Sequence, residues 1–272
     1  MNSSPALLSE EEVKTFRKTG YLLAKSVLSS PEVEAIREKF EELHARGSIP
    51  GCFQAVSAEE ANGDILKQYP RMMHPHKVDE DVKWYMLHPK VMKILSELMG
   101  EEALACQSMY YFKPPGARGQ ALHQDNFFLK VEPGTCVAAW MAIDDADEEN
   151  GGLVVVPGTH AMDIECHTPT ERSDLFAYVM EVPKSEQYEA VPVRMKSGDV
   201  LFFNGNLIHG SFPNKTQNRF RRSFICHYCG ESTVRIGNSY RPLYAADGTV
   251  LDREVNMDSG PCGGEFVETA PH

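Results

Sequence analysis

The stretches ALHQD at residues 121–125 and LIHGS at residues 207–211 contain two histidines and one aspartate at a spacing that constrains the fold. Side chains alternate between the faces of a β-strand, so His123 and Asp125 are expected to point to the same side. His209 lies far along the chain and reaches them only if another strand runs alongside, as in an antiparallel sandwich or barrel. Two imidazoles and one carboxylate are the facial triad of donors that binds non-haem Fe(II) and leaves coordination positions open. The sequence therefore predicts a metal site between strands of a β-rich fold.

The part of the chain after residue 102 consists of short apolar runs separated by proline, glycine, asparagine and aspartate. Many short strands divided by turn residues indicate a sandwich or barrel and not a doubly wound parallel sheet. The expected strands cover residues 104–112, 121–129, 135–143, 152–156, 189–195, 199–203 and 219–228. We therefore expect a mainly β protein with flanking helices.

Helical patterns dominate the part that precedes this region. A capping-box pattern of Ser9 and Glu12 begins a first helix, and proline at the first helical position begins two more. The expected elements are helices over residues 9–20, from residue 30 and over residues 88–100, with a strand over residues 21–24. Residues 1–272 are expected to form a single domain, with a helical part over about 1–100, a β-sandwich core over about 101–230 and a C-terminal extension over 231–272.

Composition excludes several classes of partner. The formal net charge of −12 argues against nucleic acid and against an anionic membrane surface. No apolar run approaches the ~18–20 residues that span a bilayer. The N-terminus has no basic region followed by an apolar core, so we expect no secretory signal and a cytoplasmic protein.

The seven cysteines are odd in number and scattered, and with no secretory signal we expect them to be reduced. Cys106, Cys136 and Cys226 lie in apolar runs, as buried thiols do. The sequence CHYC at residues 226–229, together with Cys262, leaves a zinc site as an alternative, although a second pair with ligand spacing is missing.

Several motifs occur in one order along the chain: YFKPPG at 111–116, ALHQD at 121–125, NGGLVVVPGTH at 150–160, GDVLFF at 198–203, LIHGS at 207–211, NKT at 214–216 and FRR at 220–222. In these motifs the chain resembles the phytanoyl-CoA dioxygenase family of Fe(II)- and 2-oxoglutarate-dependent oxygenases. The resemblance implies a double-stranded β-helix, a jelly-roll or cupin-like core, with His123, Asp125 and His209 as iron ligands. A carboxylate at Asp125 fills the position that halogenating relatives leave open for halide, which points to oxygen insertion.

The resemblance also implies a site for 2-oxoglutarate. Arg221 is expected to bind the far carboxylate, because a guanidinium donates two hydrogen bonds to it and stays charged when buried. Arg219 and Arg222 are the competing candidates, and Arg222 is expected to face the other way. The remaining positions that match family residues near the cosubstrate are Gln107, Met109, Trp140 and Ser211. Core packing is an equal explanation for Met109 and Trp140, and a turn for Ser211. The other candidate histidines, expected to be structural or to lie at the rim, are His74, His76, His160 and His227.

These features together predict a dioxygenase that uses Fe(II), 2-oxoglutarate and O2 to hydroxylate a C–H bond of a small molecule, releasing succinate and CO2. One alternative is a cupin-like metalloprotein that uses no 2-oxoglutarate, and another is a binding protein without turnover. The cations Lys113, Arg118, Arg235 and Arg241 lie in expected loops, which is compatible with an anionic substrate. The long segments 51–76 and 161–188 are expected to act as lids that select the substrate. The oligomeric state stays open.

Overall fold

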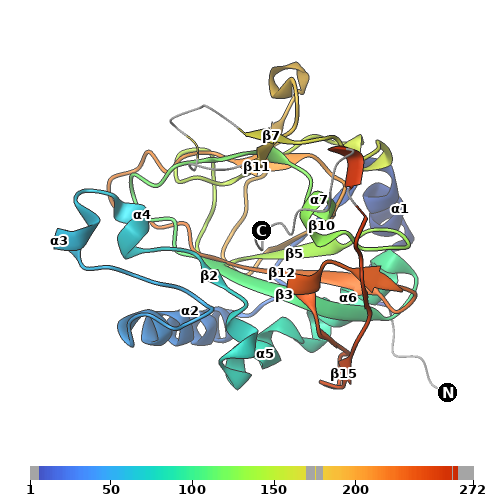
Figure 1. Cartoon of the computed structure of the whole chain (residues 1–272), viewed down its shortest axis with the longest axis horizontal. Helices are drawn as coiled ribbons and strands as arrows, with labels where there is room; N and C mark the ends of the chain where they lie inside the picture. The colour runs from blue at the N-terminus through green and yellow to red at the C-terminus, as the bar shows by residue number, and fades with distance from the viewer. Residues whose placement is uncertain (1–5, 170–174, 176–179, 259, 263–272) are drawn as a thin grey trace.

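A computed structural model describes residues 6–169, 175, 180–258 and 260–262 of the chain. Its largest element is an antiparallel sheet of eight strands, called here the major sheet (Figure 1). The strands follow the order β1-β10-β5-β12-β3-β14-β15, and β2 also pairs with β3. Their bounds are β1 (Tyr21–Ala24), β10 (Val200–Asn204), β5 (Val137–Ala142), β12 (Ser223–Gly230), β3 (Ala103–Tyr111), β14 (Leu243–Tyr244), β15 (Val250–Leu251) and β2 (Met72–Met73).

A four-stranded antiparallel sheet, called here the minor sheet, has the order β4-β11-β6-β9. Its strands are short: β4 (Gln120–His123), β11 (His209–Ser211), β6 (Leu153–Val155) and β9 (Val191–Pro192). Apolar side chains of both sheets form one buried cluster, for example Trp140 and Ile225 of the major sheet with Val155 of the minor sheet. The two sheets therefore enclose a shared core, as the sequence predicted. Two small two-stranded sheets complete the β structure, β7 (Thr168–Pro169) with β8 (Met180–Glu181) and β13 (Arg235–Ile236) with β16 (Glu254–Val255).

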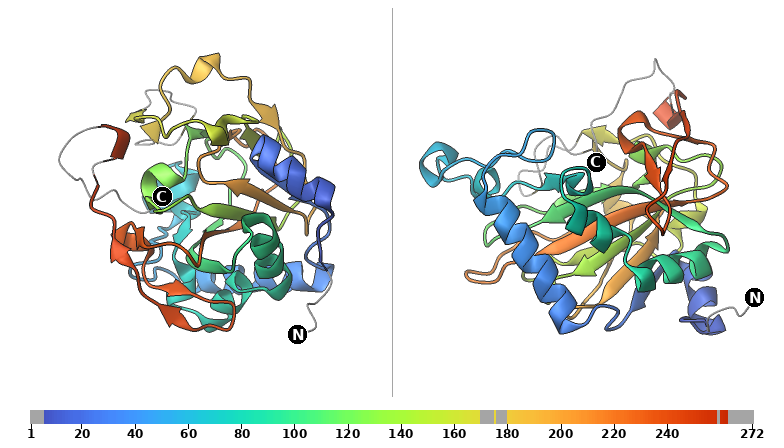
Figure 2. Two further views of the ribbon diagram at one scale, coloured as in Figure 1. Left: turned by 90° about the vertical axis from the view of Figure 1, so that its right-hand side faces the viewer. Right: turned by 90° about the horizontal axis from the view of Figure 1, so that it is seen from below.

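Helices cover the other face of the major sheet. In Figure 1 the helices α2 and α5 lie below this sheet while β11 lies above it, and the view from below in Figure 2 shows α2 crossing the strands. Phe40 of α2 is fully buried and stacks on Tyr110 of β3, with ring centroids 3.8 Å apart. The long helices are α1 (Glu10–Thr19), α2 (Ser30–Ala45), α5 (Glu80–Met86) and α6 (Pro89–Met99). The amphipathic stripe of α2 therefore anchors the helical layer, as its spacing indicated.

Local sequence rules hold at the helix ends. Ser9 and Glu12 form the capping box of α1, and Gly20 ends that helix in the left-handed conformation at a φ of 86°. Proline stands in the first turn of α2 and of α6, and Gly100 ends α6 at a φ of 77°.

Three expectations need correction. Helix α5 was not predicted. Residues 126–129, expected to continue a strand, form the helix α7 (Asn126–Leu129). Segment 51–76, expected to be irregular, contains the helices α3 (Ala58–Ala61) and α4 (Ile65–Gln68) and reaches the major sheet through β2. The short 3-10 helices are η1 (Pro75–Lys77), η2 (Thr159–Ala161), η3 (Ser185–Gln187), η4 (Asn238–Tyr240) and η5 (Gly260–Cys262). The second expected lid, 161–188, falls partly outside the described residues, at 170–174 and 176–179.

The prediction that all cysteines are reduced is wrong for two of them. Cys166 and Cys262 form a disulfide, with Cα atoms 4.8 Å apart and 96 residues between them in sequence. The zinc alternative is therefore wrong as well, because Cys262 is not available to it. Cys106, Cys136 and Cys226 are buried free thiols, as predicted. In the described part of the chain, no helix is long and apolar enough to cross a membrane.

Candidate metal centre and cosubstrate pocket

His123, Asp125 and His209 meet at one point between the two sheets. Their ligand atoms all lie within 4.8 Å of one another, and this is the group of side chains in the described residues that could hold a metal ion. Oδ1 of Asp125 is 3.4 Å from Nε2 of His123 and 3.5 Å from Nε2 of His209. Donors on one face of an octahedron with bonds of about 2.1 Å are about 3 Å apart, so the separations are close to those of a facial triad.

Adjacent strands and backbone hydrogen bonds orient the two imidazoles. His209 of β11 lies directly opposite His123 of β4 in the strand register. Nδ1 of His123 lies 2.7 Å from the carbonyl oxygen of Ala121, and Nδ1 of His209 lies 3.0 Å from that of Leu207. A carbonyl oxygen has no hydrogen to donate, so each Nδ1 must carry the hydrogen of this bond. In the neutral ring each Nε2 then keeps its lone pair for a metal.

Asp125 reaches this point by a different route from the one predicted. Strand β4 ends at His123, and Asp125, the residue directly before α7, already has helical dihedral angles (φ −62°, ψ −39°). Strand alternation therefore does not bring the two side chains together; the turn into α7 does. The reason lies in the residues that follow, since Phe128 and Leu129 of α7 pack into an apolar cluster beside β3.

His227 completes the surroundings of Asp125, and sequence reasoning missed it. Its Nε2 lies 2.9 Å from Oδ2 of Asp125, and both residues are 1% exposed. Burial alone would raise the pKa of the Asp125 carboxyl, but the neighbouring histidines His209, His227 and His123 hold it well below its usual range. Burial also lowers the pKa of His209 to about 4. An ionised carboxylate beside a neutral imidazole is the protonation state that binds a metal. The missed signal was side-chain alternation along β12, because His227 lies two residues after Ile225 and both line the same cavity.

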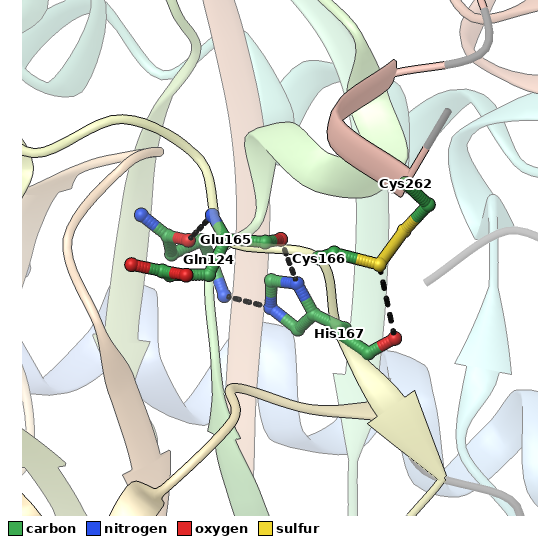
Figure 3. Close-up of a disulfide and its surroundings, with 5 residues drawn as sticks. All are labelled: Gln124, Glu165, Cys166, His167 and Cys262. Atoms are coloured by element: carbon green, nitrogen blue, oxygen red, sulfur yellow. Dashed lines mark hydrogen bonds between the residues drawn. A yellow bond between two sulfur atoms is a disulfide. The ribbon is translucent and has the colours of Figure 1, made fainter.

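A second set of contacts holds the turn between His123 and Asp125 (Figure 3). The backbone N–H of Gln124 donates to Nε2 of His167 at 3.0 Å, and the side-chain oxygen of Gln124 accepts from the backbone N–H of Glu165 at 2.9 Å. Nδ1 of His167 bonds the carbonyl of Glu165 at 2.8 Å, which fixes the ring. Cys166, which forms the disulfide with Cys262, lies between Glu165 and His167 in the sequence. The disulfide is therefore attached to the segment that supports Gln124.

Most of the predicted cosubstrate residues line one cavity together with Asp125 and His209. Its lining includes Met109, Asp125, Trp140, His209, Ser211 and Arg221. Arg221 is 3% exposed and its guanidinium carbon lies 5.0 Å from the ring centre of Trp140. Its other partners are the carbonyl of Gly151, at 3.0 Å, and the hydroxyl of Ser223. Burial lowers the pKa of Arg221 to about 10, so the group still carries its charge at neutral pH.

Gln107 is fully buried on β3, opposite His227 in the register, and two residues before the cavity residue Met109. Ser211 accepts a hydrogen bond of 2.8 Å from Nζ of Lys113. Lys113 was expected in a loop that could border the substrate pocket, and its side chain is instead buried, with 3% of the residue exposed. His74 and His76 lie buried beside β3, and His160 contacts the carbonyl of Arg17.

The neighbouring arginines are occupied elsewhere. Arg219 bonds Asp147, with the closest pair of atoms at 2.7 Å, and Arg222 bonds Asp144 through its Nε at 2.8 Å. Strand β12 begins only at Ser223, so side-chain alternation along a strand does not predict where Arg219 points. Arg219 is two residues before Arg221 in sequence, yet its side chain lies at the surface. Burial of its side chain therefore distinguishes Arg221 from Arg219.

The residues present fit a metal ion and a dicarboxylate. The two imidazole lone pairs and an ionised carboxylate converge on one point. The described partners of Arg221 are all neutral, so this buried cation lacks the anion that usually accompanies a buried charge.

Comparison with known proteins agrees with this geometry. Residues 16–223 match the family model described as Phytanoyl-CoA dioxygenase (PhyH). The chain is 31% identical over 237 residues to Phytanoyl-CoA dioxygenase 1 of Oryza sativa subsp. japonica, covering 76% of this chain and 84% of the relative. It is 30% identical over 237 residues to the peroxisomal phytanoyl-CoA dioxygenase of Mus musculus, covering 82% of this chain and 68% of the relative.

Solved structures share the fold. The non-heme alpha ketoglutarate dependent carbocyclase SnoK from nogalamycin biosynthesis superposes with a TM-score of 0.68 at 24% identity, covering 85% of this chain and 89% of its own. EctD from S. alaskensis, solved with 2-oxoglutarate and 5-hydroxyectoine, gives a TM-score of 0.65 at 21% identity, covering 85% of this chain and 79% of its own. The double-stranded β-helix predicted from the motifs is thus confirmed. The chain belongs to the phytanoyl-CoA dioxygenase family of Fe(II)- and 2-oxoglutarate-dependent oxygenases.

Proposed function

We propose that the protein hydroxylates a C–H bond of a small molecule, with Fe(II) held by His123, Asp125 and His209 and with 2-oxoglutarate anchored by Arg221. The observation that carries this proposal is one cavity whose lining includes the buried Arg221 together with Asp125 and His209, two members of the His-Asp-His cluster. When bound, iron and 2-oxoglutarate together supply O2 activation and the oxidation of the substrate, with release of succinate and CO2.

The protein residues contribute binding, orientation and exclusion of water. His123 and His209 present fixed lone pairs, and His227 holds one oxygen of Asp125 so that the other can face the metal. Arg221 offers a guanidinium fork to the far carboxylate, while the Trp140 ring covers its face. Gln107, Met109 and Ser211 are proposed to complete the cosubstrate contacts. Apolar side chains such as Leu153 and Phe203 shield the cavity from water.

The cupin-like alternative explains less. A cupin that binds no 2-oxoglutarate has no need of a buried guanidinium, whereas Arg221 is buried among neutral partners that leave its charge available for an anion.

We propose a small molecule as the substrate. The loop cations from which an anionic substrate was expected do not all remain available to bind it. Arg118, Arg235 and Arg241 are ion-paired with Asp64, Glu132 and Asp252 respectively. These ion pairs weaken the argument that the three arginines bind an anionic substrate.

The direct test is a screen of metabolite pools for succinate release with Fe(II), ascorbate and 2-oxoglutarate. A true substrate should gain one oxygen atom from ¹⁸O-labelled O2, with one succinate formed for each product. Arg221→Met should lose this coupled reaction. A product that forms at the same rate without 2-oxoglutarate would favour the cupin-like alternative instead.

Two further expectations also stay proposals. We propose one domain over residues 1–272, which predicts a single cooperative unfolding transition by both circular dichroism and tryptophan fluorescence. A cytoplasmic location also stays a proposal, and the Cys166–Cys262 disulfide points the other way, because reducing compartments disfavour disulfides. Microscopy of the tagged protein, with alkylation of free thiols in cells, decides between them.

A further inference from the structure

Lys113 is a buried cation next to the proposed cosubstrate anchor. It follows strand β3, is 3% exposed, and its Nζ donates to the hydroxyl oxygen of Ser211 at 2.8 Å. Burial and the nearby charge of Arg221 hold the pKa of Lys113 well below its usual range. Among the described residues, no carboxylate forms an ion pair with either cation. Two neighbouring buried cations without a counter-ion are unfavourable unless an anion binds between or beside them.

The surrounding backbone is shaped to accommodate Lys113. A Cβ atom on Gly151 would lie 2.4 Å from Cε of Lys113, so the glycine leaves the space that the lysine side chain fills. The Lys113 carbonyl accepts hydrogen bonds from the backbone N–H of Arg221 at 3.1 Å and from the side chain of Asn214 at 3.0 Å. Lys113 itself has a φ of 39°, a region that non-glycine residues rarely adopt. Gly151 therefore leaves room for this side chain, while Arg221 and Asn214 fix the backbone from which it extends to Ser211.

The hydrogen bond between Lys113 and Ser211 determines where the Ser211 hydroxyl hydrogen can point. When Lys113 is charged, as it would be beside a bound anion, its ammonium group can only donate, so the Ser211 oxygen is then the acceptor in this contact. The Ser211 hydroxyl hydrogen must then be donated to something other than Lys113. Ser211 lines the cavity that also contains Arg221, so an acceptor bound there can receive that hydrogen.

We propose that Lys113 is a positioning residue for 2-oxoglutarate, which fixes the Ser211 hydroxyl as a donor to the far carboxylate and adds a second positive charge beside Arg221. This inference deepens the proposed function and rests on it. The site would bind a dicarboxylate in preference to a monocarboxylate keto acid, because both cations act on the carboxylate remote from the metal.

The test compares two ligands that differ in that carboxylate. Isothermal titration calorimetry of Mn(II)-loaded protein without O2 measures the affinity for 2-oxoglutarate and for 2-oxobutanoate, which keeps the keto acid but lacks the far carboxylate. Lys113→Met should weaken 2-oxoglutarate binding by roughly 10- to 100-fold, in line with a lost charge-assisted contact. Binding of 2-oxobutanoate should change less than 3-fold, roughly. Lys215→Met, at an exposed lysine after β11, is the matched control and should change neither.

Two readouts separate this role from simple packing. Because Lys113 is proposed to act through Ser211, the effects of Lys113→Met and Ser211→Ala should be strongly non-additive in the double variant. Binding of 2-oxoglutarate should also take up protons, because the carboxylate raises the lowered pKa of Lys113. Arg221 is the charged group that faces Lys113, while Ser211 and Gly151 are neutral. Titrations in buffers of different ionisation enthalpy measure this uptake, which Lys113→Met should lose.

The outcomes are distinguishable. Equal weakening of both ligands, full additivity with Ser211→Ala, or unchanged affinity for 2-oxoglutarate would each overturn the role of Lys113. A wild-type protein that binds Mn(II) but no 2-oxoglutarate would overturn the proposed function itself. If Lys113→Met does not fold, Ser211→Ala gives the same ligand comparison, and equal weakening of both ligands there overturns the proposal.

Discussion

The two sheets that enclose the cavity differ in how they hold their functional side chains. The minor sheet contributes His123 and His209 from strands of four and three residues. The major sheet contributes Trp140 from β5 and His227 from β12, both long strands buried along their whole length, with Arg221 two residues before β12 begins. Helices pack on the far side of the major sheet, as α2 does through Phe40 (Figure 2).

The difference shows that rigidity has two sources here. On the major sheet, position follows from packing of a continuous apolar core. On the minor sheet, individual hydrogen bonds substitute for strand length, as when Thr159 accepts from the backbone N–H of Ile208 beside His209 at 2.9 Å. We infer that metal binding depends mainly on the minor sheet, and that anchoring of the cosubstrate by Arg221 depends on the major sheet, so that each can be lost separately.

The largest effect is expected from the metal ligands. His123→Ala, Asp125→Ala and His209→Ala should each abolish metal binding, and each single loss should nearly equal the triple loss because the ligands act as a unit. Anaerobic Fe(II) with 2-oxoglutarate should give a visible charge-transfer band in the wild type and none in the variants. A variant that retained the band and the activity would remove that residue from the metal centre.

Arg221→Met tests the other half of the comparison. Loss of a buried partner for a carboxylate should weaken 2-oxoglutarate binding by roughly 100-fold or more while Mn(II) binding is retained. Arg222→Met is the control, since Arg222 bonds Asp144 at the surface side of the sheet. Calorimetry gives both affinities, and equal effects of the two substitutions would contradict the assignment of Arg221.

His227 is the residue at which the division between the sheets should fail. It belongs to the major sheet but bonds the metal-site carboxylate of Asp125. His227→Phe should lower metal affinity by about 10- to 100-fold, as loss of a hydrogen bond to a ligand does. Cys226→Ala changes the adjacent buried residue and should leave metal affinity alone. If both variants bind metal as the wild type does, His227 is a packing residue.

The smallest expected effect concerns the stability of the folded protein at acidic pH. Burial lowers the pKa of His74 to about 4, below the usual value of 6.5, so the folded protein resists protonation there. The stability that neutral His74 contributes is present above pH 6.5 and is lost as the pH falls towards 4. Between pH 7 and pH 5 the loss should be about 2 kcal/mol.

His74→Asn removes this titration and suits the left-handed backbone at this position, where φ is 52°. Urea unfolding of the metal-free protein at pH 7, 6 and 5 should therefore show a flatter pH dependence in this variant than in the wild type. Identical slopes would show that His74 takes up its proton while folded. His209, whose pKa burial also lowers to about 4, titrates in both metal-free proteins, so its contribution cancels when the two slopes are compared.

The major sheet was the easier half to predict. Apolar runs such as 135–143 and 199–203 correspond to β5 and β10, because buried strands reveal themselves by local composition. The choice of Arg221 over Arg222 for a buried position also agrees with the structure, since Arg222 pairs with Asp144.

The minor sheet and its surroundings depended on contacts that no local pattern contains. The turn into α7 that brings Asp125 beside His123 is stabilised by packing against residues from β3. Burial of Lys113 requires Gly151, and the two residues are 38 positions apart (151 − 113). Pairing of Cys166 with Cys262 likewise follows from tertiary proximity alone.

The disulfide also divides the chain topologically. A bond between Cys166 and Cys262 closes the intervening chain into a covalent ring, with 96 residues of sequence separation. His209 and Arg221 belong to the ring, while His123 and Asp125 lie on the open arm that precedes it. A single peptide cleavage inside the ring would therefore open it without releasing a fragment, and the nicked protein would separate into two pieces only after reduction. The metal centre then joins arm to ring, so that a bound ion would act as a second, reversible crosslink between the two.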